Sequence, residues 1–287
     1  MSALSPLWGS VLDHVCMESA NPRALAQFYA DALRMNVEKL GGGTLLVQGP
    51  NRTLLIQPGS SGSQPFAAWR MESQEQLDAF KERLGQSKVE IEDSPTPLFS
   101  AGFAVRDPDQ RLAVFGIARG APPSPTAAEG PAARLQHVVV ATSQLGEMRR
   151  FYSDKVGFRL SDTVFSGTHA QSKGEPHVHF LRSDAEHHSF AMFAASTSRH
   201  DHHCYETGSW NDIRDWLDHL GNLDITPWWG PGRHGPGNNT FFMIKDADGN
   251  NVELSAELET GTELHEAGEW LNTRKMYNLW GAPWQRQ

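Results

Sequence analysis

Two stretches of the chain, DHVCMESANPRALAQFYADALRMNVE (residues 13–38) and QHVVVATSQLGEMRRFYSDKVGFRLSD (residues 136–162), share one pattern: a histidine, an apolar strand and a helix. His14 aligns with His137, and both helices contain Phe-Tyr-x-Asp. Two later pairs of segments also correspond: MESQEQLDAFKERLG with ETGSWNDIRDWLDHLG, and FAVRDPDQRLAVFGIA with FMIKDADGNNVELSAE. This self-similarity indicates a duplicated unit.

Each copy follows the order strand, helix, three strands, and then repeats that order. The sequence therefore predicts an α+β protein of two tandem domains, each made of two βαβββ modules that form an open, barrel-like mixed sheet with flanking helices. We expect an N-terminal domain over residues 1–118, a Pro/Ala/Gly-rich linker over 119–134, a C-terminal domain over 135–260 and an aromatic-rich tail over 261–287. The tail could cover a pocket, contact a neighbouring subunit or pack at an edge without a functional role.

Composition excludes several classes of protein. Of 287 residues, 39% are hydrophobic and 21% charged, which is typical of a globular protein. The net charge of −9 and the pI near 5.8 argue against nucleic-acid binding, which requires a basic surface. No apolar run is long enough for a membrane span, and the N-terminal sequence lacks the pattern of a signal peptide. With only two cysteines, we expect a cytoplasmic protein.

A tandem βαβββ arrangement with a histidine on the first strand of each domain resembles the vicinal oxygen chelate superfamily. The duplicated form, with an active C-terminal half, is similar to the type I extradiol ring-cleavage dioxygenases. The resemblance covers nearly the whole chain and is most specific between His137 and Glu253. It implies a homo-oligomeric enzyme that opens the ring of a catechol by inserting both atoms of O₂.

Three residues of the C-terminal half form the ligand set that this resemblance implies: His137, His202 and Glu253. Two imidazoles and one carboxylate on one side of a metal leave three adjacent positions open, which suits Fe(II) and O₂ chemistry. Mn(II) is the alternative metal. The N-terminal half provides an internal comparison, because alignment places Phe66 where the other half has His202 and Val114 where it has Glu253. We therefore expect a metal site in the C-terminal half alone.

The assignment of His202 leaves alternatives open. Neighbouring strand residues face opposite sides of a sheet, so only one of His202 and His203 can bind the metal. In the family the second ligand stands three residues before an aromatic or large apolar residue, here Tyr205, and this favours His202. His200 and the pair His177 and His179 are less favoured rivals.

Two further histidines have roles implied by the resemblance. His188, which precedes a strand, corresponds to the acid–base catalyst, whereas His187 faces the other way and is expected to be structural. His234 lies in WWGPGRHGPGNN (residues 228–239), which contains G-x-G-x-x-G. A dinucleotide loop should follow a buried strand and begin a helix, and this segment does neither. PGRHGPGNN instead resembles the extradiol loop before the last two strands, and this resemblance implies that His234 points at a substrate oxygen; a plain turn histidine is the alternative.

The sequence departs from the family at two positions. Met243 replaces a tyrosine that commonly hydrogen-bonds the substrate, and Ala247 replaces a proline. A methionine cannot donate a hydrogen bond, so Met243 could instead widen an apolar pocket. The residues that we expect to line the substrate pocket are Met243, His179, Phe190 and Tyr205.

The predicted function is therefore that of an Fe(II)-dependent extradiol dioxygenase. Two rivals share the fold. A glyoxalase-like divalent-metal isomerase or transferase usually needs further carboxylate ligands, and a metal-free protein would use the same side chains to bind a small molecule.

Overall fold

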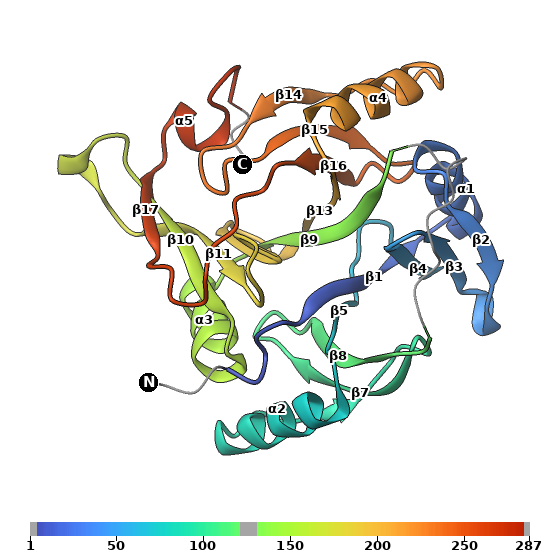
Figure 1. Ribbon diagram of the computed structural model, residues 1–287, viewed down its shortest axis with the longest axis horizontal. Coiled ribbons are helices and arrows are strands. Elements are labelled where there is room, and N and C mark those ends of the chain that lie inside the picture. Colours follow the sequence, from blue (N-terminus) through green and yellow to red (C-terminus); the bar gives the residue numbers. More distant parts are fainter. Residues whose placement is uncertain (1–4, 121–130, 284–287) are drawn as a thin grey trace.

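The computed structural model describes residues 5–120 and 131–283 (Figure 1). The N-terminal domain contains β1 (Val11–Ser19), α1 (Pro22–Ala32), β2 (Asn36–Lys39), η1 (Gly41–Gly43), β3 (Leu45–Gly49), β4 (Arg52–Pro58), β5 (Phe66–Arg70), α2 (Gln74–Gln86), β6 (Glu92–Asp93), β7 (Phe99–Arg106) and β8 (Leu112–Ala118). The C-terminal domain contains β9 (Ala133–Thr142), α3 (Leu145–Arg149), η3 (Arg150–Val156), β10 (Arg159–Phe165), η4 (Ala170–Ser172), β11 (Pro176–Arg182), β12 (Phe190–Ala194), β13 (Arg199–Thr207), α4 (Trp210–Gly221), β14 (Trp229–Arg233), β15 (Thr240–Lys245), β16 (Asn251–Ala256), β17 (Gly268–Leu271) and α5 (Arg274–Tyr277).

The strands form two mixed sheets, one for each domain. The first has the order β2-β3-β4-β1-β5-β8-β7-β6, and the second β14-β15-β16-β13-β9-β12-β11-β10-β17. In each sheet two βαβββ modules meet through their first strands, β1 against β5 and β9 against β13, and both pairs are antiparallel. The predicted α+β fold of paired βαβββ modules is confirmed.

Local sequence explains where the helices begin. Asn21 caps α1 by accepting a hydrogen bond from the amide of Ala24, and a proline follows it at the first helical position. Ser73 and Ser209 cap α2 and α4 in the same way. Within the described parts of the chain, no helix is both long and apolar enough to cross a membrane.

The ends of the C-terminal domain extend beyond residues 135–260. Residues 121–130 of the predicted linker lie outside the described residues, and β9 already begins at Ala133. At the other end, β17 pairs in parallel with β10 and α5 buries Met276 and Tyr277. The tail thus adds a strand and a helical turn to the C-terminal sheet.

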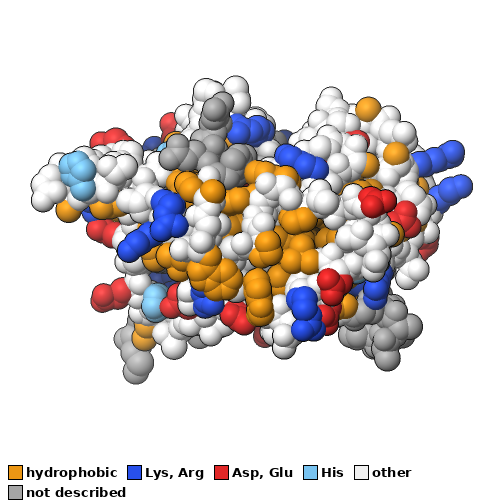
Figure 2. All heavy atoms as spheres, turned by 90° about the horizontal axis from the view of Figure 1, so that it is seen from above, with side chains coloured by type: hydrophobic (Ala, Val, Ile, Leu, Met, Phe, Trp, Pro, Cys, Tyr) orange, Lys and Arg blue, Asp and Glu red, His pale blue; other side chains and the backbone are white. Residues whose placement is uncertain are grey.

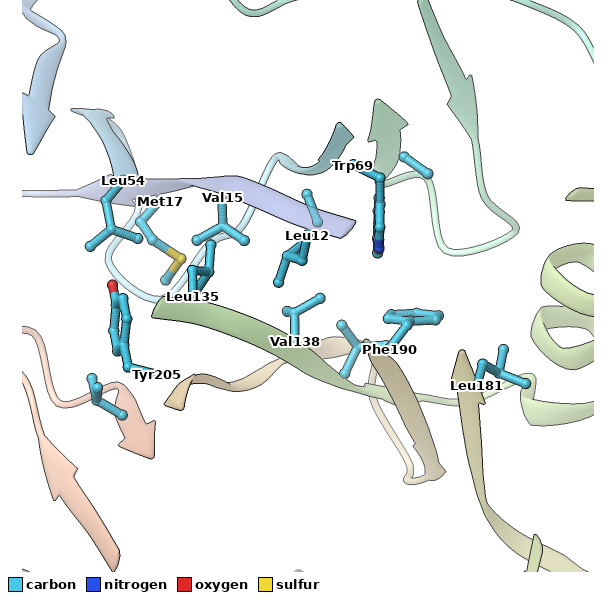
Figure 3. Packing of buried hydrophobic residues seen from close by; sticks show 14 of the residues in the cluster. Leu12, Val15, Met17, Leu54, Trp69, Leu135, Val138, Leu181, Phe190 and Tyr205 are labelled. Carbon is cyan, nitrogen blue, oxygen red and sulfur yellow. The ribbon is translucent and has the colours of Figure 1, made fainter. Parts of the chain in front are cut away.

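The two domains pack through one continuous hydrophobic core. Leu12, Val15 and Met17 of β1 face Leu135 and Val138 of β9, and all five side chains are buried (Figure 3). After an irregularity that follows Leu12 in β1 and Leu135 in β9, every second residue of each strand points into this shared core. One face of the C-terminal sheet is therefore closed by the N-terminal domain, which leaves the other face for a site.

A pair of equivalent hydrogen bonds crosses between the domains. The hydroxyl of Tyr29 in α1 donates to Asp246 Oδ2 (3.0 Å), and that of Tyr152 in η3 donates to Asp107 Oδ2 (3.1 Å). These tyrosines belong to the duplicated Phe-Tyr-x-Asp segments, and the aspartates belong to the duplicated strand–turn–strand segments. Each copy therefore attaches its helix to the turn of the other copy.

Apolar side chains also reach the surface. Trp210 and Trp280 are 41% and 55% exposed and lie edge to face, with ring centroids 5.5 Å apart. On the side of the molecule that carries α4, β14 and α5, apolar side chains gather in one area among charged ones (Figure 2). The homo-oligomer and the cytoplasmic location stay predictions.

Removing the two crossing hydroxyls should destabilise the protein. Tyr29→Phe or Tyr152→Phe removes one hydrogen bond to a buried aspartate, which keeps the donors of its own turn, and we expect each to lower the free energy of unfolding by about 1–3 kcal/mol. Tyr205→Phe is a matched control, because the Tyr205 hydroxyl is buried without a hydrogen-bond partner among the described residues. Urea denaturation measures all three; equal losses in the control and the test variants would contradict the role of these bonds.

Candidate metal centre and active site

A cavity lies on the face of the C-terminal sheet opposite the N-terminal domain. It contains all five residues predicted as ligands or catalysts, which are His137, His188, His202, His234 and Glu253. The rest of its wall is formed by one residue with a hydroxyl, Tyr277, and by the apolar residues Val139, Val178, Phe180, Ala191, Phe193, Pro236 and Met276. Segments more than a hundred residues apart in sequence thus meet around one space.

The three predicted ligands converge at the inner end of this cavity. His202 Nε2 lies 3.3 Å from His137 Nε2 and 3.3 Å from Glu253 Oε2. Donor atoms at adjacent positions of an octahedral ion, each about 2.1 Å from it, are separated by about 3 Å. His137 is 2% exposed, His202 3% and Glu253 1%, so the surrounding residues restrict the movement of all three side chains. The geometry and the donor types fit a divalent metal.

Neighbouring side chains turn the ring nitrogens toward that point. His137 Nδ1 is hydrogen-bonded to Gln136 Oε1, and His202 Nδ1 to Asp201 Oδ2 (2.7 Å). Because an oxygen acceptor requires the proton on Nδ1, Nε2 is the nitrogen of each ring that would bind a metal, and in His202 it already lies 3.3 Å from Glu253 Oε2. These outer contacts select the tautomer that can bind a metal.

The electrostatics of the triad show that it is poised for a positive charge. Burial alone would lower the pKa of His202, but its hydrogen bonds with Asp201 and Glu253 raise it. Burial would also raise the pKa of Glu253, yet its hydrogen bonds with His202 and His234 hold it well below the usual range. The carboxylate is therefore ionised and available as an anionic ligand.

Sequence reasoning missed a fourth residue at this point, Cys204. A ring nitrogen of His137, the Cys204 sulfur and an oxygen of Glu253 all lie within 4.8 Å of one another. Burial raises the pKa of the Cys204 thiol well above its usual value, and the thiol donates a hydrogen bond to Ser255 Oγ (3.1 Å). A thiol is a poor ligand compared with a thiolate, and Cys204 does not line the cavity. Three donors therefore remain, with the cavity side open.

His188 stands over the metal ligands on the segment before β12. Its ring centroid is 4.4 Å from that of His137, and its Nδ1 is 3.0 Å from His187 Nδ1. Burial, with the rings of His137 and His187 nearby, holds the pKa of His188 well below its usual value. His188 is thus a neutral imidazole in the cavity wall, able to accept a proton.

His234 is fixed by contacts on several sides. Its ring stacks on Phe241 with centroids 3.7 Å apart, and its Nδ1 donates to the carbonyl of Tyr277 (2.7 Å). Its Nε2 lies 3.7 Å from Glu253 Oε1. The glycine-rich segment after β14 therefore presents an imidazole beside the metal ligands, and no helix follows it.

The four residues expected in the substrate pocket do not line this cavity. Because Val178 and Phe180 face it, strand alternation turns His179 the other way, onto Thr163 Oγ1 (3.0 Å). Phe190 and Tyr205 point into the core between the domains, where Figure 3 shows both. Met243 shares a face with its strand partner Glu253 and is buried in the apolar cluster that also supplies Val139 and Met276 to the cavity wall, but it does not itself line the cavity.

The rival histidines also lie elsewhere. His203 is on the opposite face of β13 from His202 and contacts the Tyr29 hydroxyl through Nε2 (3.1 Å). His200 stacks on His203, and burial lowers its pKa to about 3. Neither belongs to the cavity wall.

The N-terminal domain repeats the framework without the donors. Across β1, β5 and β8, His14 pairs with Ala68, and Ala68 pairs with Val114. Across β9, β13 and β16, the corresponding residues are His137, Cys204 and Glu253. The registers therefore agree with the alignment of Val114 with Glu253. His14 is bonded to Asp13 (2.6 Å) and Thr96 (2.8 Å) and packs on apolar rings.

Residues 134–254 match the model of the Glyoxalase/Bleomycin resistance protein/Dioxygenase superfamily, and the predicted resemblance is confirmed for this part of the chain. Metapyrocatechase 2 of Cupriavidus necator is 29% identical over 52% of the chain and 44% of its own length. The chain therefore spans less than half of that relative. The manganese-dependent 2,3-dihydroxybiphenyl 1,2-dioxygenase of Geobacillus genomosp. 3 is 24% identical over 84% of the chain and 83% of its own length.

Solved structures share the tandem fold. The Mn(II)-bound glyoxalase from Novosphingobium aromaticivorans has a TM-score of 0.78 at 23% identity, covering 95% of this chain and 91% of its own. Homoprotocatechuate 2,3-dioxygenase from Arthrobacter globiformis has a TM-score of 0.80 at 20% identity, with coverages of 99% and 91%. Both kinds of enzyme therefore use this framework.

Metal binding should depend on the ligands and on their outer contacts. We expect Asp201→Ala to weaken metal binding by about 10–100-fold, because His202 loses the partner that sets its tautomer. His202→Ala should weaken it further, whereas His14→Ala, the equivalent of a ligand in the other domain, should leave it unchanged. Anaerobic titration with Mn(II) measures the affinities; equal affinity in His202→Ala and the native protein would place the metal elsewhere.

Proposed function

We propose that this protein is an extradiol dioxygenase that binds Fe(II), with Mn(II) as the alternative, and cleaves the ring of a catechol with O₂. The observation that carries the proposal is the convergence of two imidazoles and one carboxylate with one side open to a cavity. Such a ligand set leaves neighbouring positions for a chelating diol and for O₂. The relationship to a metapyrocatechase and a dihydroxybiphenyl dioxygenase supports it.

Each residue of the site has a defined task in this reaction. His137, His202 and Glu253 would hold the metal, which when bound supplies a site for the diol oxygens and for activating O₂. His188, neutral and in the cavity wall, accepts a proton from a substrate hydroxyl and returns it later. His234, held by Tyr277 and Phe241, orients a substrate oxygen. The apolar wall excludes water from the ring.

A glyoxalase-type isomerase or transferase is the second candidate, favoured by the fold it shares with a Mn(II)-bound glyoxalase. That chemistry usually uses further carboxylate ligands, and Glu253 is the one carboxylate among the described residues of the cavity wall. A metal-free binding protein is the third. The ionised Glu253 beside two imidazoles argues for a bound cation instead.

The dioxygenase is tested by anaerobic purification, metal assay and addition of O₂ with a panel of catechols. We expect O₂ uptake and a yellow ring-fission product, and a loss of about 10²–10⁴-fold in kcat when His188 is replaced by Asn, because the proton acceptor is removed. His203→Asn is the control variant: it makes the same substitution on the face of the sheet away from the cavity, and it shows whether a loss of kcat comes from impaired folding alone. Metal without O₂ uptake would favour the glyoxalase type, and a protein that takes up no metal would favour the binding protein.

The wall of the cavity also predicts the kind of ring that it accepts. Apart from the histidines, Glu253 and Tyr277, its described residues are apolar, and no lysine or arginine is among them, so a carboxylate on the ring would be buried without a cationic partner. We therefore expect kcat/KM for 4-methylcatechol to exceed that for 3,4-dihydroxyphenylacetate by more than about tenfold. Steady-state O₂ uptake with both compounds measures the ratio, and a preference for the acid would contradict this view of the pocket.

A further inference from the structure

A line of buried hydrogen bonds leads from the cavity to the C-terminal tail. His188 Nδ1 lies 3.0 Å from His187 Nδ1, and His187 Nε2 lies 3.1 Å from Asp162 Oδ2 in β10. Trp270 of β17 donates its indole N–H to the same carboxylate oxygen (2.7 Å). His187, His188 and Asp162 are 6%, 4% and 7% exposed, so water does not compete for these bonds.

The carboxylate at the end of this line determines where the protons are. An ionised carboxylate only accepts hydrogen bonds, so His187 Nε2 must carry a hydrogen. When the imidazole of His187 is neutral, its Nδ1 is an acceptor, and the 3.0 Å contact then has His188 Nδ1 as the donor. The Nε2 of His188 is left unprotonated.

We infer that Asp162 and His187 are positioning residues that hold His188 in the tautomer whose Nε2 accepts a proton from a molecule in the cavity. The effect of this tautomer on catalysis rests on the proposed dioxygenase activity, whereas the tautomer itself follows from the hydrogen bonds alone. The proposal gives His187, which the sequence predicts to be structural, the task of orienting His188.

The tail fixes the carboxylate. Trp270 approaches Asp162 from one side, and Gly268 pairs with Asp162 across β17 and β10. A Cβ at Gly268 would lie 2.3 Å from Asp162 Oδ1, so the carboxylate can occupy its position only because residue 268 has no side chain. The aromatic-rich tail thus supports the proton acceptor through Asp162 and His187.

The tautomer can be observed without turnover. In Zn(II)-loaded full-length protein with ¹⁵N-labelled histidine, we expect the His188 signals of a protonated Nδ1 and an unprotonated Nε2, assigned by their loss in His188→Gln. His187→Leu removes the acceptor and should shift His188 toward a mixture of tautomers. A protonated Nε2 in the native protein would overturn the inference whatever the enzyme catalyses.

Kinetics test the consequence. His187→Leu should lower kcat by about 10–100-fold with KM and metal content unchanged. His187→Asn, whose side-chain oxygen can occupy the place of Nδ1, should recover most of that loss. His14→Leu removes an equally buried histidine with two partners in the other domain and should keep the native kcat. Trp270→Phe should give a smaller loss of kcat than His187→Leu.

The outcomes separate the two hypotheses. Equal losses in His187→Leu and His187→Asn, or an effect on KM alone, would contradict a positioning role. If the native protein consumes no O₂ with any catechol while the ¹⁵N signals are as expected, the proposed dioxygenase activity is wrong, but the inferred tautomer of His188 is confirmed.

Discussion

The register of three adjacent strands, β9, β13 and β16, is the constraint on which the rest of the structure depends. It places His137 opposite Cys204 and Cys204 opposite Glu253, so that donors distant in sequence become neighbours. Strand alternation then sends His202 into the cavity and His203 into the core between the domains. A shift of the register of β13 by one residue would exchange these two faces. It would remove His202 from the cavity and also place polar side chains in the core. Core packing and metal geometry are therefore maintained by the same backbone hydrogen bonds.

The duplicated fold supports two different tasks. In the N-terminal domain, His14 has both ring nitrogens occupied by Asp13 and Thr96, and apolar residues stand where the other domain has donors. That domain instead covers the back of the C-terminal sheet and contacts the segment that carries His187 and His188. Trp69 donates to Ser189 Oγ (3.4 Å), and Ser183 donates to the carbonyl of Ser10 (2.7 Å). One copy thus holds in place the segment of the other copy that carries His187 and His188.

The sequence predicted the duplication, the fold and the residues that meet in the cavity, because each depends on residue types at matching places in the two halves. It did not predict which face each pocket residue takes. In β12, whose sequence is FAMFA, the residues on both faces are apolar. The pattern therefore does not predict whether Phe190 or Ala191 faces the cavity. Cys204 could have been found, because it lies two residues after His202 and so shares its face. The contact of Trp270 with Asp162 joins residues 108 positions apart and leaves no local signal.

The distribution of charge explains why the cavity suits proton transfer beside a cation. Asp201 stands behind His202, and Asp162 stands behind His187, each outside the apolar wall and each in contact with an imidazole Nδ1 or Nε2. Within the described wall, Glu253 is the one formal negative charge, so a bound divalent cation is only partly neutralised by protein. An anionic substrate oxygen completes that balance, and in a cavity of low dielectric the attraction is much stronger than in water. In the proposed reaction a neutral His188 would be the acceptor of the substrate's proton, and its lowered pKa agrees with a site in which a second positive charge beside a cation is unfavourable.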